Sequence, residues 1–228
     1  MTQFSRYAIY VMADEDFHQE ASRWLGWDCR LGCALEHPNV DGLPDSIDAL
    51  TQTPRKYGFH GTVKPPFRLA NGETQASLQE ACAMLMPTLP AAKVDELVVR
   101  PLDGFVAVVP ESPSASLAKL AAGVVEKLDG FRAPPSSDEL EKRRKAGLSP
   151  AQEANLLRWG YPYVMDEFRF HMTLSGKRSP QEAERLAARL GQHFAPVLPK
   201  PFNITSLALL GEDEAGRFHL ITSYALAS

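Results

Sequence analysis

Residues 167–175, with the sequence EFRFHMTLS, alternate between polar and apolar side chains. Such alternation is typical of a β-strand that buries one face, because successive side chains of a strand point to opposite sides. The buried face would carry Phe168, Phe170, Met172 and Leu174, and the polar face Glu167, Arg169, His171, Thr173 and Ser175. The pattern therefore predicts a strand that presents a His-x-Thr motif on its polar side.

A second stretch, residues 55–67 with the sequence RKYGFHGTVKPPF, carries the same motif. FHGTV aligns with FHMTL, and a phenylalanine precedes the histidine in both. On a strand, the face with the motif would hold Lys56, Gly58, His60, Thr62 and Lys64, opposite Tyr57, Phe59 and Val63. One such motif is usually a solvated strand face, but two in matching strand contexts favour a functional pair.

The surroundings of the two motifs also repeat, in the order strand, helix, strand, helix, strand. In the first half, about 6–102, these elements are predicted at 6–13, 17–27, around His60, at 74–86 and at 96–102. In the second half, about 104–210, they are predicted at 104–110, 116–128, around His171, at 179–194 and at 203–210, and a last strand follows at 217–227. We therefore expect residues 1–228 to form a single domain made of two lobes.

Residues from about 133 to 165 have no counterpart in the first half, so they are predicted to be an insertion of one or two polar helices. A helix start is indicated at Ser149, where Pro150 and Gln152 complete a capping box, and a similar box begins at Ser179. The insertion lies just before the second motif, where it would be either a lid or a surface decoration.

The composition limits the class of protein and of partner. With 228 residues, 44% apolar and 23% charged, the chain is expected to be a soluble, cytoplasmic protein. A net charge of −4 argues against binding of long nucleic acid, which normally needs a basic surface. It does not exclude a small phosphorylated substrate. The three cysteines, Cys29, Cys33 and Cys82, complete neither a disulfide framework nor a zinc pattern, so ordinary thiols are expected.

Two histidines that face each other across a groove suit the cleavage of a phosphodiester without a metal. One imidazole would activate the nucleophile as a base, and the other would protonate the leaving oxygen from the opposite side. Histidine suits both roles because its pKa lies near 6.5. Thr62 and Thr173 would offer hydroxyls to the phosphate oxygens. A metal site is disfavoured, because no carboxylate repeats beside His60 and His171.

The motifs FHGT and FHMT resemble those of the 2H phosphoesterase superfamily, which is defined by two His-x-Thr/Ser motifs. More closely, RYAIY, KYGFHGTVKPPF and RWGYPYVMDEFRFHMTLSG are similar to the DUF1045 branch of that superfamily. The resemblance implies a bilobal, pseudo-twofold α+β fold, with two mostly antiparallel sheets around a central cleft and helices outside. It also implies cofactor-free and metal-independent chemistry, with His60 and His171 catalytic and Thr62 and Thr173 binding phosphate.

The branch is associated with phosphonate metabolism, which suggests a ribosyl cyclic phosphate such as 5-phosphoribosyl 1,2-cyclic phosphate. Further candidates for phosphate binding are Lys56, Lys64 and Arg169, which share the faces of the motifs. Candidates for stacking on a base or ribose are Tyr57, Trp159, Tyr161 and Tyr163, although a core position fits each of them equally well.

The leading hypothesis is thus a hydrolase that opens a small cyclic phosphate, the roles of its two histidines being unassigned. A non-catalytic module that binds a phosphate or nucleotide is one alternative, although simple binding does not need paired titratable groups. Processing or ligation of RNA ends is another, which the low net charge disfavours.

Overall fold

The computed structural model describes residues 4–13 and 15–227. The strands are β1 (Arg6–Val11), β2 (Trp27–Asp28), β3 (Cys33–Ala34), β4 (Gly61–Phe67), β5 (Ala92–Val94), β6 (Leu97–Leu102), β7 (Phe105–Pro110), β8 (Met172–Thr173), β9 (Phe202–Ile204), β10 (Ser206–Glu212) and β11 (Phe218–Ala225). The helices are α1 (Glu15–Leu25), α2 (Ile47–Arg55), α3 (Gln75–Leu85), α4 (Ala115–Lys127), α5 (Ser137–Arg144), α6 (Pro150–Trp159) and α7 (Pro180–Phe194).

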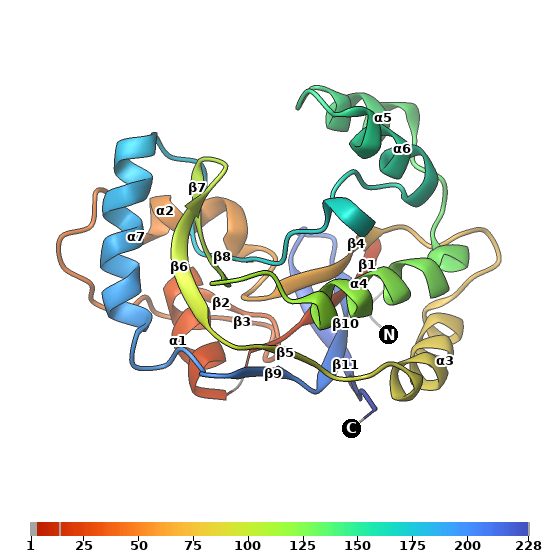
Figure 1. The fold of residues 1–228 in the computed structure, drawn as a ribbon, viewed down its shortest axis with the longest axis horizontal. Coiled ribbons are helices and arrows are strands. Elements are labelled where there is room, and N and C mark those ends of the chain that lie inside the picture. Colours follow the sequence, from red (N-terminus) through yellow and green to blue (C-terminus); the bar gives the residue numbers. More distant parts are fainter. Residues whose placement is uncertain (1–3, 14, 228) are drawn as a thin grey trace.

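Seven strands form one sheet in the order β11-β10-β1-β4-β8-β7-β6, and every neighbouring pair is antiparallel. The sheet has two parts, β11-β10-β1-β4 and β8-β7-β6, which are the two lobes in Figure 1. A single register pair, Gly61 opposite Met172, joins β4 to β8. The expected α+β fold with mostly antiparallel sheets is confirmed, but the two motif strands are neighbours in one continuous sheet and do not face each other from separate sheets.

Each lobe takes strands from both halves of the sequence. β1 and β4 pair with each other, and β1 also pairs with β10 from near the end of the chain. In the other lobe, β7 lies between β8 and β6, which precedes it in the sequence. The expected order of strand, helix, strand, helix, strand is present in both halves. The last strand of each half pairs with the first strand of the other half, β6 with β7 and β10 with β1.

The helices cover the lobes and close the core. α7 packs on β6 and β7, and α4 packs on β4 (Figure 1). The apolar stripe of α7 is buried, from Ala183 to Phe194, and Ser179 caps the helix through Glu182 as the sequence indicated. From α1, the buried indole of Trp24 donates a hydrogen bond of 2.8 Å to the carbonyl of Leu174, just after β8. This bond ties the first helix to the second motif.

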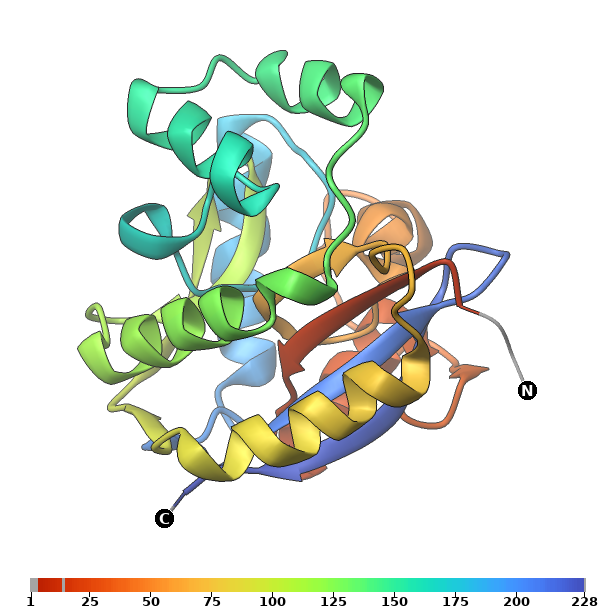
Figure 2. The ribbon, with the colours of Figure 1, turned by 90° about the vertical axis from the view of Figure 1, so that its right-hand side faces the viewer.

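The insertion holds two helices, α5 and α6, which stand apart from the sheet in both views (Figures 1 and 2). Both begin with a capping box, at Ser136 and Ser149. α5 has no buried residue, whereas α6 buries Leu156. Within the part of the chain that is described, no helix is long and apolar enough to cross a membrane.

The motif strands are shorter than their alternating sequences predicted. Before β8, the amide of Phe168 donates to the carbonyl of Met165 in a 3₁₀ turn. The regular strand begins only at Met172, so residues 168–171 have no partner in the sheet. After β8, Leu174 and Ser175 both donate to Val106, which ends the regular register. β4 likewise begins only at Gly61, one residue after the first histidine.

Gly61 has no room for a side chain. A Cβ there would lie 2.2 Å from the ring of Phe170, so Gly61→Ala should displace this ring and cost about 1–3 kcal/mol of unfolding free energy. Denaturant unfolding of Gly61→Ala, alone and with Phe170→Leu, measures the effect. The cost should shrink in the double variant, which lacks the crowded ring.

Gly191 is the matched control, because it lies inside α7 and nothing lies within 4 Å of the Cβ it would gain. Gly191→Ala should stabilise the protein by about 1 kcal/mol through helix propensity alone. Equal stability of Gly61→Ala and the wild type would contradict the close packing at the strand junction.

Candidate active site

The pairing of β4 with β8 brings the two His-x-Thr motifs together. Gly61 lies directly opposite Met172 in an antiparallel register. His60 and His171 lie just before the paired residues of β4 and β8, and Thr62 and Thr173 lie just after them. Because side chains alternate along a strand, these four point to the same side of the sheet, away from buried Met172. Thr62 of the first motif and His171 of the second line the same cavity, so the two motifs meet at this junction.

His60 is held by its own backbone and by Thr62. Its Nδ1 lies 2.9 Å from the carbonyl oxygen of Gly58, and its Nε2 lies 3.1 Å from Oγ1 of Thr62. A carbonyl can only accept, so Nδ1 carries the proton and donates it to Gly58. In the neutral ring, Nε2 is therefore the acceptor, and the Thr62 hydroxyl donates to it.

His171 repeats this arrangement. Its Nδ1 donates to the carbonyl of Arg169 over 2.8 Å, again two residues before the histidine. The tautomer is thus the same, with the lone pair on Nε2. A main-chain acceptor orients each ring and puts the lone pair on Nε2, which on His60 accepts from the Thr62 hydroxyl.

Burial sets the charge state of the two rings. Desolvation lowers the pKa of His60 from 6.5 to about 4, although the Gly58 carbonyl opposes this shift, and His171 lowers the pKa slightly further. Desolvation also lowers the pKa of His171, against the Arg169 carbonyl and the carboxylate of Asp103, which both raise it. Both imidazoles are therefore neutral near pH 7, and only His171 has an acidic neighbour that favours its charged form.

Aromatic rings that the sequence did not assign to the site pack against both histidines. Tyr10 of β1 is fully buried, and its ring stacks on His60 with centroids 3.7 Å apart and planes 20° from parallel. Phe105 of β7 lies 5.6 Å from His171, centroid to centroid. These contacts desolvate the imidazoles. No local signal identifies Tyr10, because it reaches the site through the pairing of β1 with β4.

A cavity of about 280 Å³ opens beside the second motif, and this cavity is called the catalytic pocket below. Its lining includes five of the predicted residues, Thr62, Tyr161, Tyr163, Arg169 and His171. The sequence did not identify Asp103, Phe105 and Lys177, which also line it. Asp103 and Gly104 form the tight turn between β6 and β7, and the Asp-Gly pair is a hairpin signature that could have placed Asp103 at a strand end.

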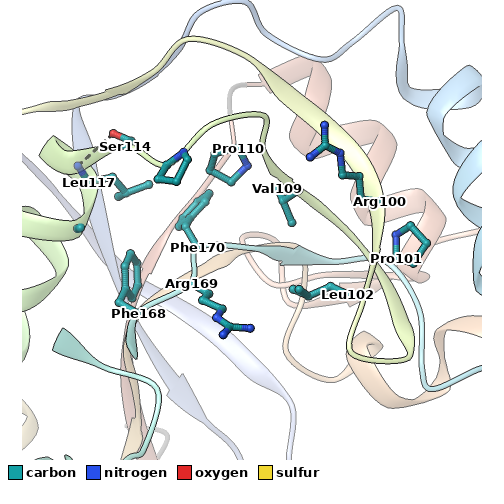
Figure 3. A pocket seen from close by; sticks show the side chains of 12 residues that line it. Arg100, Pro101, Leu102, Val109, Pro110, Ser114, Leu117, Phe168, Arg169 and Phe170 are labelled. Carbon is teal, nitrogen blue, oxygen red and sulfur yellow. Dashed lines mark hydrogen bonds between the residues drawn. The ribbon is translucent and has the colours of Figure 1, made fainter. Parts of the chain in front are cut away.

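A second, more apolar cavity of about 340 Å³ adjoins the catalytic pocket and shares Leu102, Phe168 and Arg169 with it. Figure 3 shows this cavity between α4 and the β6–β7 hairpin, with Phe168 and Phe170 on one side and Val109 and Leu102 on another.

The other predicted residues lie outside the catalytic pocket, and His60 and Thr173 are not among the lining residues of any of the three cavities near the site. Lys56 and Tyr57 line a third cavity, with the Lys56 ammonium 4.9 Å from the centre of the Tyr57 ring. Lys64 is 2% exposed, and its ammonium donates to the carbonyl of Val125 over 3.2 Å, near Asp129. This burial under α4 removes Lys64 from the expected phosphate-binding set. Trp159 lines none of these three cavities and stacks with Arg158.

Among the described residues, no group of three or more His, Cys, Asp or Glu side chains is arranged to hold a metal ion. Cys29, Cys33 and Cys82 are free thiols, of which Cys29 and Cys82 are buried. The site therefore offers two imidazoles, two hydroxyls and nearby cations as its chemical groups.

Residues 62–219 match the family described as "Protein of unknown function (DUF1045)", a match that begins just after His60. The chain is also 37% identical over 221 residues to a protein of Janthinobacterium sp. (strain Marseille) named ribose 1,5-bisphosphate phosphokinase PhnN, covering 93% of this chain and 48% of that protein. A protein of Laribacter hongkongensis (strain HLHK9) with the same name is 34% identical over 214 residues, with 92% and 49% covered. The chain spans about half the length of these curated relatives.

Solved structures with a similar course of the chain include E. coli LigT complexed with phosphate, with a TM-score of 0.47, 12% identity and full coverage of both chains. TT0787 of Thermus thermophilus gives a TM-score of 0.45 and 14% identity, with 97% of each chain covered. At these low values the family assignment stands on the sequence match.

The lowered pKa of His60 predicts an acid-sensitive fold. The unfolded chain takes up a proton near pH 6.5 and the folded ring only near pH 4, so stability is complete above pH 6.5 and is lost as pH falls toward 4. The loss attributable to His60 should approach about 3 kcal/mol. Denaturant unfolding at pH 7 and 4.5 measures it.

In His60→Gln this part of the pH dependence should disappear. Thr62→Val is the matched control, since it alters the same hydrogen bond but keeps the imidazole, and it should retain the wild-type slope. If His60→Gln loses as much stability on acidification as the wild type, another group is responsible.

Proposed function

The chain belongs to the DUF1045 family, and for this protein we propose metal-independent phosphodiesterase activity, in which two histidines open a small cyclic phosphate ester. The observation that carries the proposal is the pairing of β4 with β8, which brings the two His-x-Thr motifs next to each other. Both imidazoles have Nδ1 bound to a main-chain carbonyl, so Nε2 is the proton-accepting nitrogen of each ring, and on His60 the substrate would take the place of the Thr62 hydroxyl.

This arrangement suits in-line displacement at phosphorus. One imidazole Nε2 accepts a proton from a water molecule as its oxygen bonds to phosphorus. The bond from phosphorus to one ring oxygen breaks, and the second imidazole donates its Nε2 proton to that oxygen. The product is a phosphate monoester with a free hydroxyl. The two histidines have exchanged protonation states, and proton exchange with water restores them.

The environments of the two rings favour His60 as the base and His171 as the acid. His60 has the lower pKa, about 4, so it is neutral and ready to accept a proton. His171 has the Asp103 carboxylate nearby, which raises its pKa. An anionic phosphate that binds between the rings would raise the pKa further, so the acid becomes protonated as the substrate enters.

Three features support a small, sugar-sized substrate. The catalytic pocket has a volume of about 280 Å³, and Arg169 and Lys177 in its lining complement phosphate charge. Tyr161 and Tyr163 offer rings for a ribose or a base. The longer relatives are named for ribose 1,5-bisphosphate, which supports a ribosyl cyclic phosphate such as 5-phosphoribosyl 1,2-cyclic phosphate.

The first test is hydrolysis of a panel of cyclic phosphates with EDTA present, including 2′,3′-cyclic nucleotides and ribosyl 1,2-cyclic phosphates. Turnover should persist in EDTA. His60→Gln and His171→Gln should each lower kcat by about 10²–10⁴-fold, because each removes acid–base catalysis. His193→Gln is the control, since this histidine pairs with Glu20 outside the site, and it should keep wild-type turnover.

Near-full activity in either site variant would refute the two-histidine mechanism. If folded protein bound a cyclic phosphate tightly without changing it, the activity proposal would fail and a binding module would take its place.

Asp103→Asn tests which histidine is the acid. Asparagine tolerates the left-handed backbone at this position, where φ is 46°, so the turn should survive. Loss of the carboxylate should lower the pKa of His171. If His171 is the acid, the basic limb of the kcat/KM profile moves to lower pH; movement of the acidic limb alone would reverse the assignment.

A further inference from the structure

A third cavity, of about 370 Å³, lies between the sheet and the inserted helix α5, and it is called the basic pocket below. Its lining carries one carboxylate, Glu139, and six cationic side chains: Arg6, Lys56, Arg68, Arg132, Lys142 and Arg143. Such a concentration of positive charge is unexpected in a chain whose net charge is −4. A concave, cationic wall raises the local concentration of anions.

Three of these cations already have carboxylate partners. Arg6 forms a two-point ion pair with Glu212. Arg68 donates to Glu139 over 2.8 Å. Arg132 pairs with Asp129 over 2.8 Å. These arginines therefore shape the wall, and their charges are largely compensated.

The other three, Lys56, Lys142 and Arg143, form no ion pair within the described part of the chain. Two of them lie instead over aromatic rings of the same pocket. The Arg143 guanidinium is 4.5 Å from the centre of the Tyr161 ring, and Lys56 lies similarly over Tyr57. A cation over a ring has no carboxylate partner there, so these side chains have donors to offer an anion, although Lys56 also lies within charge–charge range of Glu212.

The basic pocket adjoins the catalytic pocket. Tyr161 lines both cavities, so only one side chain's thickness separates them at that point. On the other side, the Tyr57 ring centre lies 6.1 Å from that of His60. The two pockets are therefore neighbours that meet at Tyr161, with Tyr57 close to His60.

We infer that the basic pocket binds a phosphate monoester that the substrate carries in addition to its cyclic phosphate. This inference rests on the proposed function and narrows its substrate class. The preferred substrate is a small sugar or nucleoside cyclic phosphate with a second phosphate at the far end. The anion would bridge Lys56, at the end of α2, and Lys142 and Arg143 of α5.

A bridging anion would also help to hold the inserted helix α5 against the body of the protein. α5 buries none of its residues, so apolar packing does not hold it against the body of the protein. One link to the body is the ion pair between Arg68 and Glu139, which is exposed. A phosphate bound to Lys142 and Arg143 would add charge-assisted hydrogen bonds across the same gap.

The test compares two substrates that differ only in the second phosphate, adenosine 2′,3′-cyclic phosphate and the same compound with a 5′-phosphate. The wild type should prefer the 5′-phosphorylated compound in kcat/KM by about tenfold or more, as expected for charge-assisted contacts. This preference should collapse in the double variant Lys142→Gln/Arg143→Gln. Lys145→Gln, just beyond the same helix and outside the pocket lining, should keep it.

Calorimetry with ribose 5-phosphate separates this inference from the proposed reaction, because that ligand has no cyclic phosphate. Binding to the wild type and to His171→Gln, and loss of binding in Lys142→Gln/Arg143→Gln, would support the basic pocket even if no cyclic phosphate is opened. Equal binding by the wild type and the double variant would overturn the inference, as would equal kcat/KM for the two adenosine substrates.

Discussion

The pairing of Gly61 with Met172 is the contact on which the site depends. It is the one register position that joins the two lobes into a continuous sheet among the described strands, and it fixes which residues share a face. A slip by one residue would turn a histidine of one motif away from the other. Gly61 allows this pairing because it has no side chain, and the ring of Phe170 occupies the space that a side chain would need.

The shortness of the two motif strands is part of how the histidines are oriented. In a longer strand, the carbonyls of Gly58 and Arg169 would be candidates for ladder hydrogen bonds. Because β4 and β8 begin only at Gly61 and Met172, both carbonyls accept from an imidazole instead. The irregular backbone before each strand thus selects the tautomer, and the sheet selects the side on which the rings lie.

Local patterns in the sequence were sufficient for the motifs, the repeated order of elements and the buried stripe of α7. They failed where contacts join distant segments. Lys64 has the parity of the motif in the sequence, but a register shift between Thr62 and Lys64 pairs Lys64 with Ile9, and its ammonium is buried beneath α4. The stacking of Tyr10 on His60 depends on the pairing of β1 with β4, and the basic pocket combines residues from Arg6 to Tyr161. No short segment of the sequence shows which distant residues will lie together.

The exchange of strands between the halves affects how the chain acquires its structure. β6 and β7 are joined by a tight turn and can pair as soon as both have been synthesised. β1 is different, because its neighbour β10 lies about 200 residues later, where Arg6 meets Glu212. Contacts of such large sequence separation form slowly. During synthesis β1 therefore keeps an open edge until β10 has been made, and an open strand edge is a site of mispairing in a nascent chain.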